Sequence, residues 1–105
     1  MKHFNAYQEF VKTMKVYPSE YKTIYPTLGL VGEAGEVAEK VKKVLRGDRV
    51  IPREEIAEEV GDVLWYAAAL AEDLGYTLEE IVMMNVAKLS DRKERGVVKG
   101  DGDRR

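Results

Sequence analysis

Apolar residues recur at intervals of three and four along most of the chain, which is the spacing that lines one face of an α-helix. The first such stretch, from Phe4 to Met14, predicts a short helix that ends before Pro18. Three longer stretches predict helices over residues 27–46, over residues 53–74, and from Thr77 to a stop at Gly96. No segment alternates apolar and polar residues with the period of a half-buried strand, so the sequence predicts an all-α fold.

Local signals mark the ends of these helices. Pro26 can start the second helix, because a proline in the first turn removes an N–H that would have no partner. Thr77 and Glu80 have the spacing of a capping box. Gly47 follows the second helix, where a glycine commonly ends a helix. The proline- and tyrosine-rich residues 16–27 are predicted to form a connecting loop.

Three long amphipathic helices and a short N-terminal one, joined by short connections, favour an antiparallel helical bundle. A chain of 105 residues suits one domain, which we expect to span residues 1–105 with a mobile polar tail at 97–105. A domain of this size buries only about two-thirds of the surface of its extended chain. Self-association would add burial, so helices from two or more subunits could complete the bundle.

The charge and composition exclude several classes of protein. The net charge is −2, from 17 basic and 19 acidic residues that are well interspersed, so no surface for polymeric nucleic acid is expected. Apolar runs are short, so no membrane partner is expected. Cysteine is absent, which rules out disulfides and thiolate metal sites. The first residues lack the apolar core of a signal peptide, so we expect a cytoplasmic location.

Two acidic pairs are the most informative feature of the chain. Glu33 and Glu36 lie three residues apart on the second predicted helix, and Glu59 and Asp62 repeat this spacing on the third. A three-residue spacing puts both carboxylates of a pair on one side of a helix, so facing helices would gather four oxygen ligands. The carboxylates would repel one another unless a cation offset their charge. These four residues therefore predict a site for Mg²⁺, or for Mn²⁺ as a substitute.

Residues beside the acidic pairs have two interpretations each. Gly29, Gly32 and Gly35 each weaken a helix by about 1 kcal/mol relative to alanine, which indicates either close helix packing or room for a ligand. Trp65 lies opposite the apolar stripe of its helix, so we expect it outside the core, at a subunit interface or in contact with a nucleobase. Tyr66 either lines a cleft beside Glu59 and Asp62 or serves only in packing.

On the fourth predicted helix, Asn85, Lys88 and Arg92 lie along one strip. They are candidate ligands for an anion, or the two cations pair with acids of neighbouring helices. His3 is the only histidine, which excludes a histidine-based zinc site and the Glu-x-x-His motif of di-iron bundles.

Three motifs together resemble those of the MazG-like nucleotide pyrophosphohydrolases, a family of all-α NTP pyrophosphatases. They are LGLVGEAGEVAEKVKK at residues 28–43, EEVGDVLWY at residues 58–66, and Asn85-x-x-Lys88-Leu-x-x-Arg92. A single Glu-x-x-Glu is weak, but both acidic motifs followed by Asn-x-x-Lys make a specific signal. The resemblance spans almost the whole chain and is closest to the stand-alone, single-domain members.

The resemblance implies Mg²⁺-dependent hydrolysis of a nucleoside triphosphate between its α and β phosphates, in a homodimer or homotetramer. It implies metal ligands at the four acids and phosphate contacts by the Asn85, Lys88 and Arg92 side chains. Glu36 or Glu39 would act as the catalytic base, and a contact of Trp65 with the base is our inference. Two alternatives are phosphoribosyl-ATP pyrophosphohydrolase activity, or a non-catalytic helical interaction module whose acids bind a structural cation.

Overall fold

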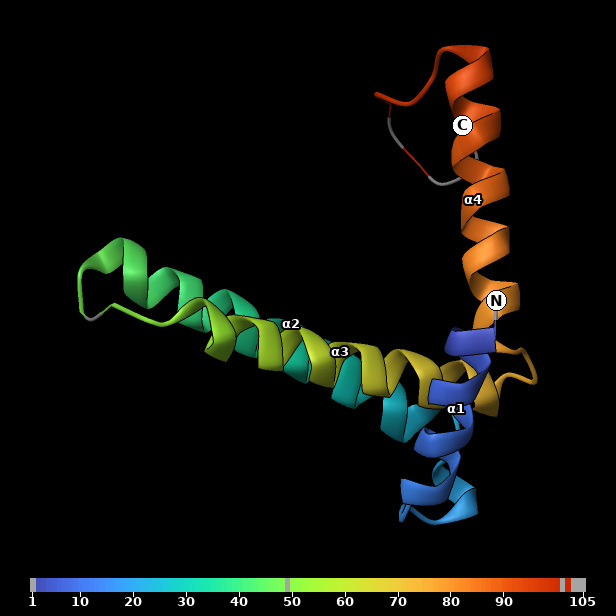
Figure 1. Cartoon of the computed structure of the whole chain (residues 1–105), viewed down its shortest axis with the longest axis horizontal. Helices are drawn as coiled ribbons and strands as arrows, with labels where there is room; N and C mark the ends of the chain where they lie inside the picture. The colour runs from blue at the N-terminus through green and yellow to red at the C-terminus, as the bar shows by residue number, and fades with distance from the viewer. Residues whose placement is uncertain (1, 49, 101, 103–105) are drawn as a thin grey trace.

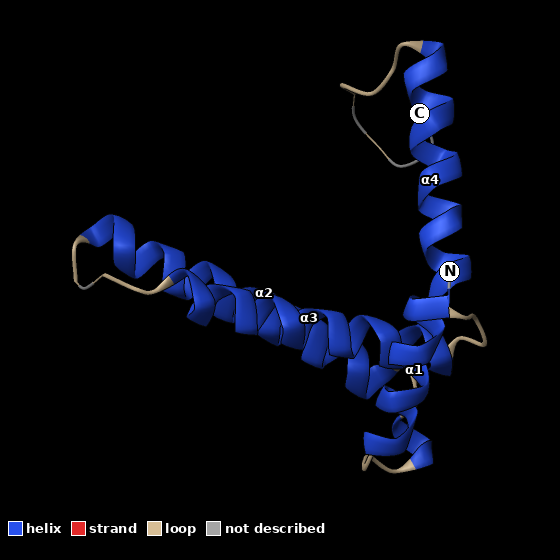
Figure 2. Cartoon of the chain, viewed as in Figure 1, coloured by secondary structure: helices blue, strands red, loops and turns tan. Residues whose placement is uncertain are grey.

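The computed structural model describes residues 2–48, 50–100 and 102 of the chain. Within these residues the chain forms helices and turns without a strand, which confirms the all-α prediction (Figure 2). No helix in this part of the chain is long and apolar enough to span a bilayer. The elements are α1 (Lys2–Met14), a short 3₁₀ helix η1 (Ser19–Tyr21), α2 (Ile24–Arg46), α3 (Arg53–Asp73) and α4 (Leu78–Arg95).

The helices α2 and α3 form a long antiparallel hairpin, and α1 packs against α3 at the open end of this hairpin (Figure 1). The fourth helix contacts α1 and α3 at this same end and then points away from the hairpin. One chain therefore supplies an antiparallel pair with α1 across it, while α4 runs alongside neither long helix.

The observed helix ends follow the local signals with one exception. Glycines in the left-handed conformation cap α2 at Gly47 (φ 82°) and α4 at Gly96 (φ 73°). The capping box at the start of α4 is confirmed, with Thr77 Oγ1 accepting from the N–H of Glu80 at 3.1 Å. The exception is α2, which begins at Ile24, before Pro26, so the predicted loop is shorter. Pro26 is tolerated because the N–H groups of a first turn have no partner within the helix.

The tail predicted at 97–105 is described only in part. The N–H of Val97 donates to the carbonyl of Arg92 at 2.9 Å, which extends the hydrogen bonding past the end of α4. The mobility expected of the tail also concerns residues 101 and 103–105, which lie outside the described residues.

The buried core lies where α1, α3 and the start of α4 meet. Val11, Ala68, Ala69 and Leu78 are buried there, and Trp65 is half-buried against this cluster. The expectation that Trp65 lies outside the core was therefore wrong in part. The helical wheel assumed one apolar face on α3, whereas α1 covers a second face of that helix.

Two side chains of α1 hold the start of α4. The buried Gln8 accepts the N–H of Leu78 at 2.9 Å and donates to the carbonyl of Tyr76 at 3.0 Å. Asn5 accepts the N–H of Glu79 at 3.2 Å. Because the first N–H groups of a helix lack partners within it, these contacts replace hydrogen bonds that water would otherwise make. The amide side chains thereby attach α4 to the core.

The carboxylate of Asp73 joins the end of α3 to the segment before α2. Its side chain is 1 % exposed, and it accepts from Lys15 Nζ at 2.6 Å, from Tyr17 Oη at 2.9 Å and from the N–H of Thr23 at 2.9 Å. Burial raises the pKa of Asp73, but the hydrogen bonds from these three donors outweigh burial, and the net pKa is lowered. The ionised form of Asp73 therefore stabilises the fold.

We predict that Asp73→Asn lowers the free energy of unfolding by about 2–3 kcal/mol at neutral pH, because hydrogen bonds to charged groups contribute about 1.5–3 kcal/mol. Urea unfolding followed by circular dichroism measures this loss. Since the folded-state pKa is depressed, the contribution of Asp73 is present above the unfolded pKa of about 3.9 and is lost as pH falls through the folded value. The gap between variant and wild type should therefore close on acidification.

A matched control is Asp91→Asn on α4, where Asp91 forms an exposed pair with Arg95. This change should alter stability by no more than about 1 kcal/mol, as is usual for exposed pairs. Equal losses in the two variants, or a gap that widens in acid, would contradict the role assigned to Asp73.

Candidate metal centre

Three carboxylates from facing helices meet in the middle of the α2–α3 hairpin. Glu33 of α2 and Glu59 and Asp62 of α3 each offer an oxygen, and these oxygens all lie within 4.8 Å of one another. The first two side chains are half-buried and Asp62 is exposed. We call Glu33, Glu59 and Asp62 the acidic cluster. Antiparallel packing brings the cluster together because Glu59 and Asp62, three residues apart, lie on the side of α3 that faces Glu33 of α2.

The other two predicted acids stand apart from the acidic cluster. Glu36 is exposed, and its oxygens do not belong to the group of ligand atoms formed by the described residues. Its charge still raises the pKa of Glu33, after larger contributions from burial and from the acidic cluster. Glu39 pairs with Lys42 at 3.1 Å on its own helix. The structure thus brings together three of the four predicted metal ligands.

The two half-buried glutamates respond in opposite ways to their surroundings. The pKa of Glu33 is raised, chiefly by burial and then by a hydrogen bond with Glu59. The pKa of Glu59 is lowered, chiefly by a hydrogen bond from Lys40. A donor set of crowded carboxylate oxygens suits a hard divalent cation such as Mg²⁺ or Mn²⁺, because its charge would relieve the repulsion among the three acids, which adds to the effect of burial on the pKa of Glu33. The residues present therefore fit the predicted metal.

Lys40 is a site residue that the reasoning from sequence missed. Its ammonium Nζ lies 3.0 Å from Oε1 of Glu59, across the gap between the two helices. The available signal was its position about two helical turns after Glu33, which places both side chains on one face of α2.

A cavity of about 300 Å³ adjoins the acidic cluster and is lined by Glu33, Asp62, Trp65 and Tyr66. The two aromatic rings are edge to face, with centroids 5.1 Å apart. Burial, with smaller contributions from Tyr25, Glu33 and Asp62, raises the pKa of Tyr66. Trp65 therefore packs against the core, which the sequence did not predict, and also forms a wall of this cavity.

The absence of a side chain at Gly29 leaves room for the Tyr66 ring. A Cβ at Gly29 would overlap Cε1, Cδ1 and Cζ of Tyr66, so close packing explains this glycine. A Cβ at Gly32 or Gly35 would meet no described atom within 4 Å beyond its chain neighbours and the backbone of its own helix. Packing within a single chain therefore accounts for one of the three glycines.

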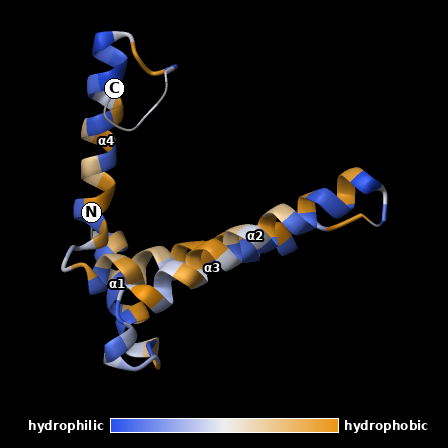
Figure 3. Cartoon of the chain, turned by 180° about the vertical axis from the view of Figure 1, so that it is seen from behind, coloured by the Kyte–Doolittle hydropathy of each residue, from blue (hydrophilic) through white to orange (hydrophobic). Residues whose placement is uncertain are grey.

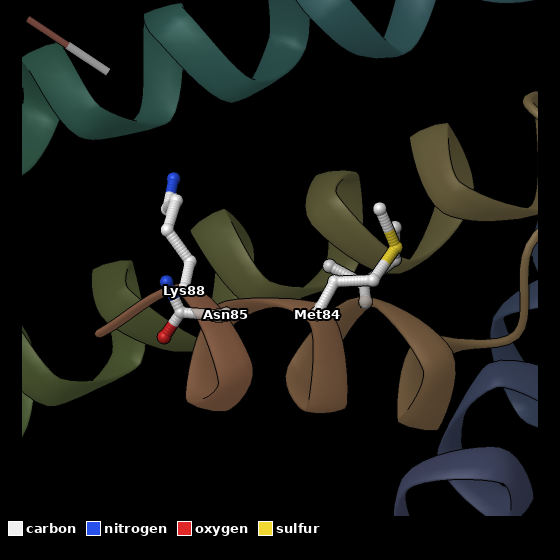
Figure 4. Close-up of a pocket in the computed structure, with 4 residues that line it drawn as sticks. Met84, Asn85 and Lys88 are labelled. Atoms are coloured by element: carbon white, nitrogen blue, oxygen red, sulfur yellow. The ribbon is translucent and has the colours of Figure 1, made fainter. Parts of the chain in front are cut away.

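Two of the three predicted phosphate ligands on α4 line a different cavity. Asn85 and Lys88, with Ile81 and Met84, line a hollow of about 360 Å³, and Figure 4 shows the labelled side chains on one side of α4. Arg92 is only 5 % exposed, and the structure thus holds its side chain away from solvent. The cavity of the acidic cluster does not include these residues. A single chain does not bring them to the carboxylates.

The chain is similar to known proteins in its sequence. The family model of the MazG nucleotide pyrophosphohydrolase domain matches residues 22–97, a range that holds α2, α3 and α4. The chain therefore belongs to the MazG family. It is also similar to the Gene 37 protein of Mycobacterium phage L5. The two are 44 % identical over an alignment of 113 positions, which covers 98 % of this chain and 99 % of the phage protein. No solved structure matches the chain.

We predict that Gly29→Ala destabilises the protein by about 1–3 kcal/mol, the usual result of overpacking, because the added methyl displaces the Tyr66 ring. Fluorescence of Trp65, which contacts that ring, should change in the folded variant. Gly35→Ala is the matched control and should stabilise α2 by up to about 1 kcal/mol through helix propensity. If both variants unfold at the same denaturant concentration as the wild type, Tyr66 does not depend on Gly29.

Proposed function

We propose that this protein hydrolyses nucleoside triphosphates between the α and β phosphates, releasing a nucleoside monophosphate and pyrophosphate, in a reaction that requires Mg²⁺. The observation that carries the proposal is the acidic cluster, three carboxylate oxygens within 4.8 Å of one another beside an aromatic-walled cavity. Membership of the MazG family supports the same chemistry.

In this proposal Glu33, Glu59 and Asp62 hold the cation, and Glu36 completes the set from the same helix as Glu33. When bound, Mg²⁺ would polarise a phosphoryl oxygen and lower the pKa of water. A nearby carboxylate must then accept the proton of the attacking water. The hydrogen bond from Lys42 lowers the pKa of Glu39 and makes it a weaker base. We therefore assign the proton transfer to Glu36 in preference to Glu39.

The cavity beside the acidic cluster provides the proposed place for the nucleoside. Trp65 forms one wall of this cavity, and stacking of a base on an aromatic ring contributes about 1–3 kcal/mol. Asp62 lies three positions before Trp65 on α3. A triphosphate bound at the acidic cluster would therefore place its nucleoside near the indole ring of Trp65.

We also propose that the functional unit is a homodimer or a homotetramer. The chain exposes 7849 Å², whereas a compact protein of 11.9 kDa exposes about 5,900 Å². Its radius of gyration of 16.4 Å also exceeds the roughly 13 Å of a compact domain of this length. Large apolar side chains remain about half exposed on all three long helices, whose apolar stretches are visible in Figure 3, for example Leu28, Val31, Leu64, Met83, Val86 and Leu89.

A second copy would also explain how the predicted phosphate ligands on α4 reach an acidic cluster. Asn85 and Lys88 lie on α4, which points away from the hairpin of its own chain (Figure 1). Packing of α4 along the hairpin of another copy would cover apolar surface on both chains. In the proposed assembly Asn85, Lys88 and Arg92 contribute to the phosphate site, where their positive charges and amide would offset the charge of departing pyrophosphate.

We predict that incubation with nucleoside and deoxynucleoside triphosphates plus Mg²⁺ yields pyrophosphate and monophosphate, separable by ion-exchange chromatography. Asp62→Asn should reduce this turnover by about 100-fold or more, because even neighbours of metal ligands change function by about 10- to 100-fold. Glu54→Gln, in the exposed first turn of α3, is the control and should retain activity.

Release of orthophosphate would contradict the bond assignment. Cleavage of phosphoribosyl-ATP alone would favour that related pyrophosphohydrolase activity. Metal binding without turnover of any nucleotide would instead indicate an interaction module with a structural cation.

We predict that analytical ultracentrifugation of the full chain gives a mass at least twice the 11.9 kDa of one copy. Leu89→Glu on α4 should shift the assembly toward monomer, because burying an unpaired carboxylate in an apolar interface is strongly unfavourable. Lys93→Glu, at an exposed position of α4, is the charge control, because it changes the net charge by −2 where Leu89→Glu changes it by −1. A monomer at micromolar concentration would rule out the proposed assembly.

A further inference from the structure

One cation is already in contact with the acidic cluster. Lys40 extends from α2 to the opposite helix, where its Nζ lies 3.0 Å from Oε1 of Glu59 and 3.5 Å from the carbonyl oxygen of Glu55. The Lys40 and Glu59 side chains are only 23 % and 17 % exposed. The pair is thus held between α2 and α3 and is largely removed from solvent.

The location of this ion pair distinguishes it from the pair that Lys42 forms on α2. Lys42 lies two residues further on and pairs with Glu39 at 3.1 Å, but its partner is on the same helix and their side chains are 60 % and 44 % exposed. Pairs of that kind are common on helix surfaces and contribute little. Lys40 instead crosses between helices and takes a carboxylate of the acidic cluster as its partner.

An ammonium and a divalent ion at one carboxylate oppose each other. Both are attracted to Glu59, and at separations of a few ångströms they repel each other strongly in a partly desolvated gap. The ammonium also supplies positive charge to the cluster before any metal is present. It therefore keeps the acids close together in the metal-free protein and raises the cost of metal entry.

We propose that Lys40 is a resident counter-cation of the acidic cluster, which a divalent ion must displace from Glu59 in order to bind. This inference rests on the proposed function, because it takes the acidic cluster to be the metal site. Lys40 acts through Glu59 and is a positioning residue. Because Lys40 must first be displaced, a free divalent ion binds more weakly than it would to the three carboxylates without Lys40.

The test is titration of the full chain with Mn²⁺, in which binding is measured by calorimetry or by the electron paramagnetic resonance signal of free Mn²⁺. Lys40→Met keeps the length of the side chain without its charge and should bind Mn²⁺ about tenfold more tightly, within the range in which neighbours tune metal sites. Lys40→Arg restores the charge and should bind like the wild type. Lys42→Met is the matched control and should leave the affinity unchanged.

Thermal unfolding separates this role from a purely structural one. In EDTA, Lys40→Met should melt below the wild type, because the acids have lost their counter-charge, whereas Mn²⁺ should raise its melting temperature by more than it raises that of the wild type. If Lys40 only stabilises the fold, Lys40→Met should lower the melting temperature in EDTA and that in Mn²⁺ by the same amount. This result would overturn the proposal.

The outcomes also separate this proposal from the one on which it rests. Measurable Mn²⁺ binding that is equal or weaker in Lys40→Met overturns the role of Lys40 and leaves the metal site standing. If neither the wild type nor any variant binds Mn²⁺, the metal site and the role of Lys40 are both wrong. Should Lys40→Met fail to fold, Lys40→Gln provides the same comparison with a neutral polar side chain.

Discussion

Repulsion between carboxylates held between two packed helices is the constraint on which this structure depends. Packing of α2 on α3 brings Glu33, Glu59 and Asp62 together, and the pKa of Glu33 is raised, chiefly by burial and then by its contacts with the other two acids. A proton on Glu33 or positive charge nearby offsets this repulsion. Lys40 supplies that charge from within the chain, and a divalent ion would supply it during the proposed reaction.

Side chains outside the acidic cluster hold the hairpin to the segments around it. Asp73 ties the end of α3 to the segment before α2, and Gly29 lets Tyr66 lie against α2 beside the cavity. Gln8 and Asn5 attach α4 to the core. These contacts lie at the open end of the hairpin, whereas much of the apolar surface along it is uncovered. The chain therefore leaves much apolar surface uncovered, which is the reason we propose a second copy.

Prediction from the sequence succeeded where the signal is local. Glycine at a left-handed residue and the Thr77–Glu80 capping box depend on the backbone of a few neighbours, so the ends of the helices near Gly47 and Gly96 and the all-α class followed directly. Membership of the MazG family also followed, because the spacing of the acidic pairs is itself a property of the sequence. The start of α2 was placed too late, since Pro26 is compatible with several first-turn positions.

The tertiary structure alone decided which residues meet. Helical periodicity specifies the face of each helix but leaves open the angle and the height at which two helices cross, so it could not distinguish Glu36, which stands apart, from Glu33, which joins the cluster. The same ambiguity hid the contact of Lys40 with Glu59. Trp65 packs against the core because α1 covers a second face of α3, an arrangement that no single helix encodes. Positions along each helix came from the sequence, and distances between helices came only from their packing.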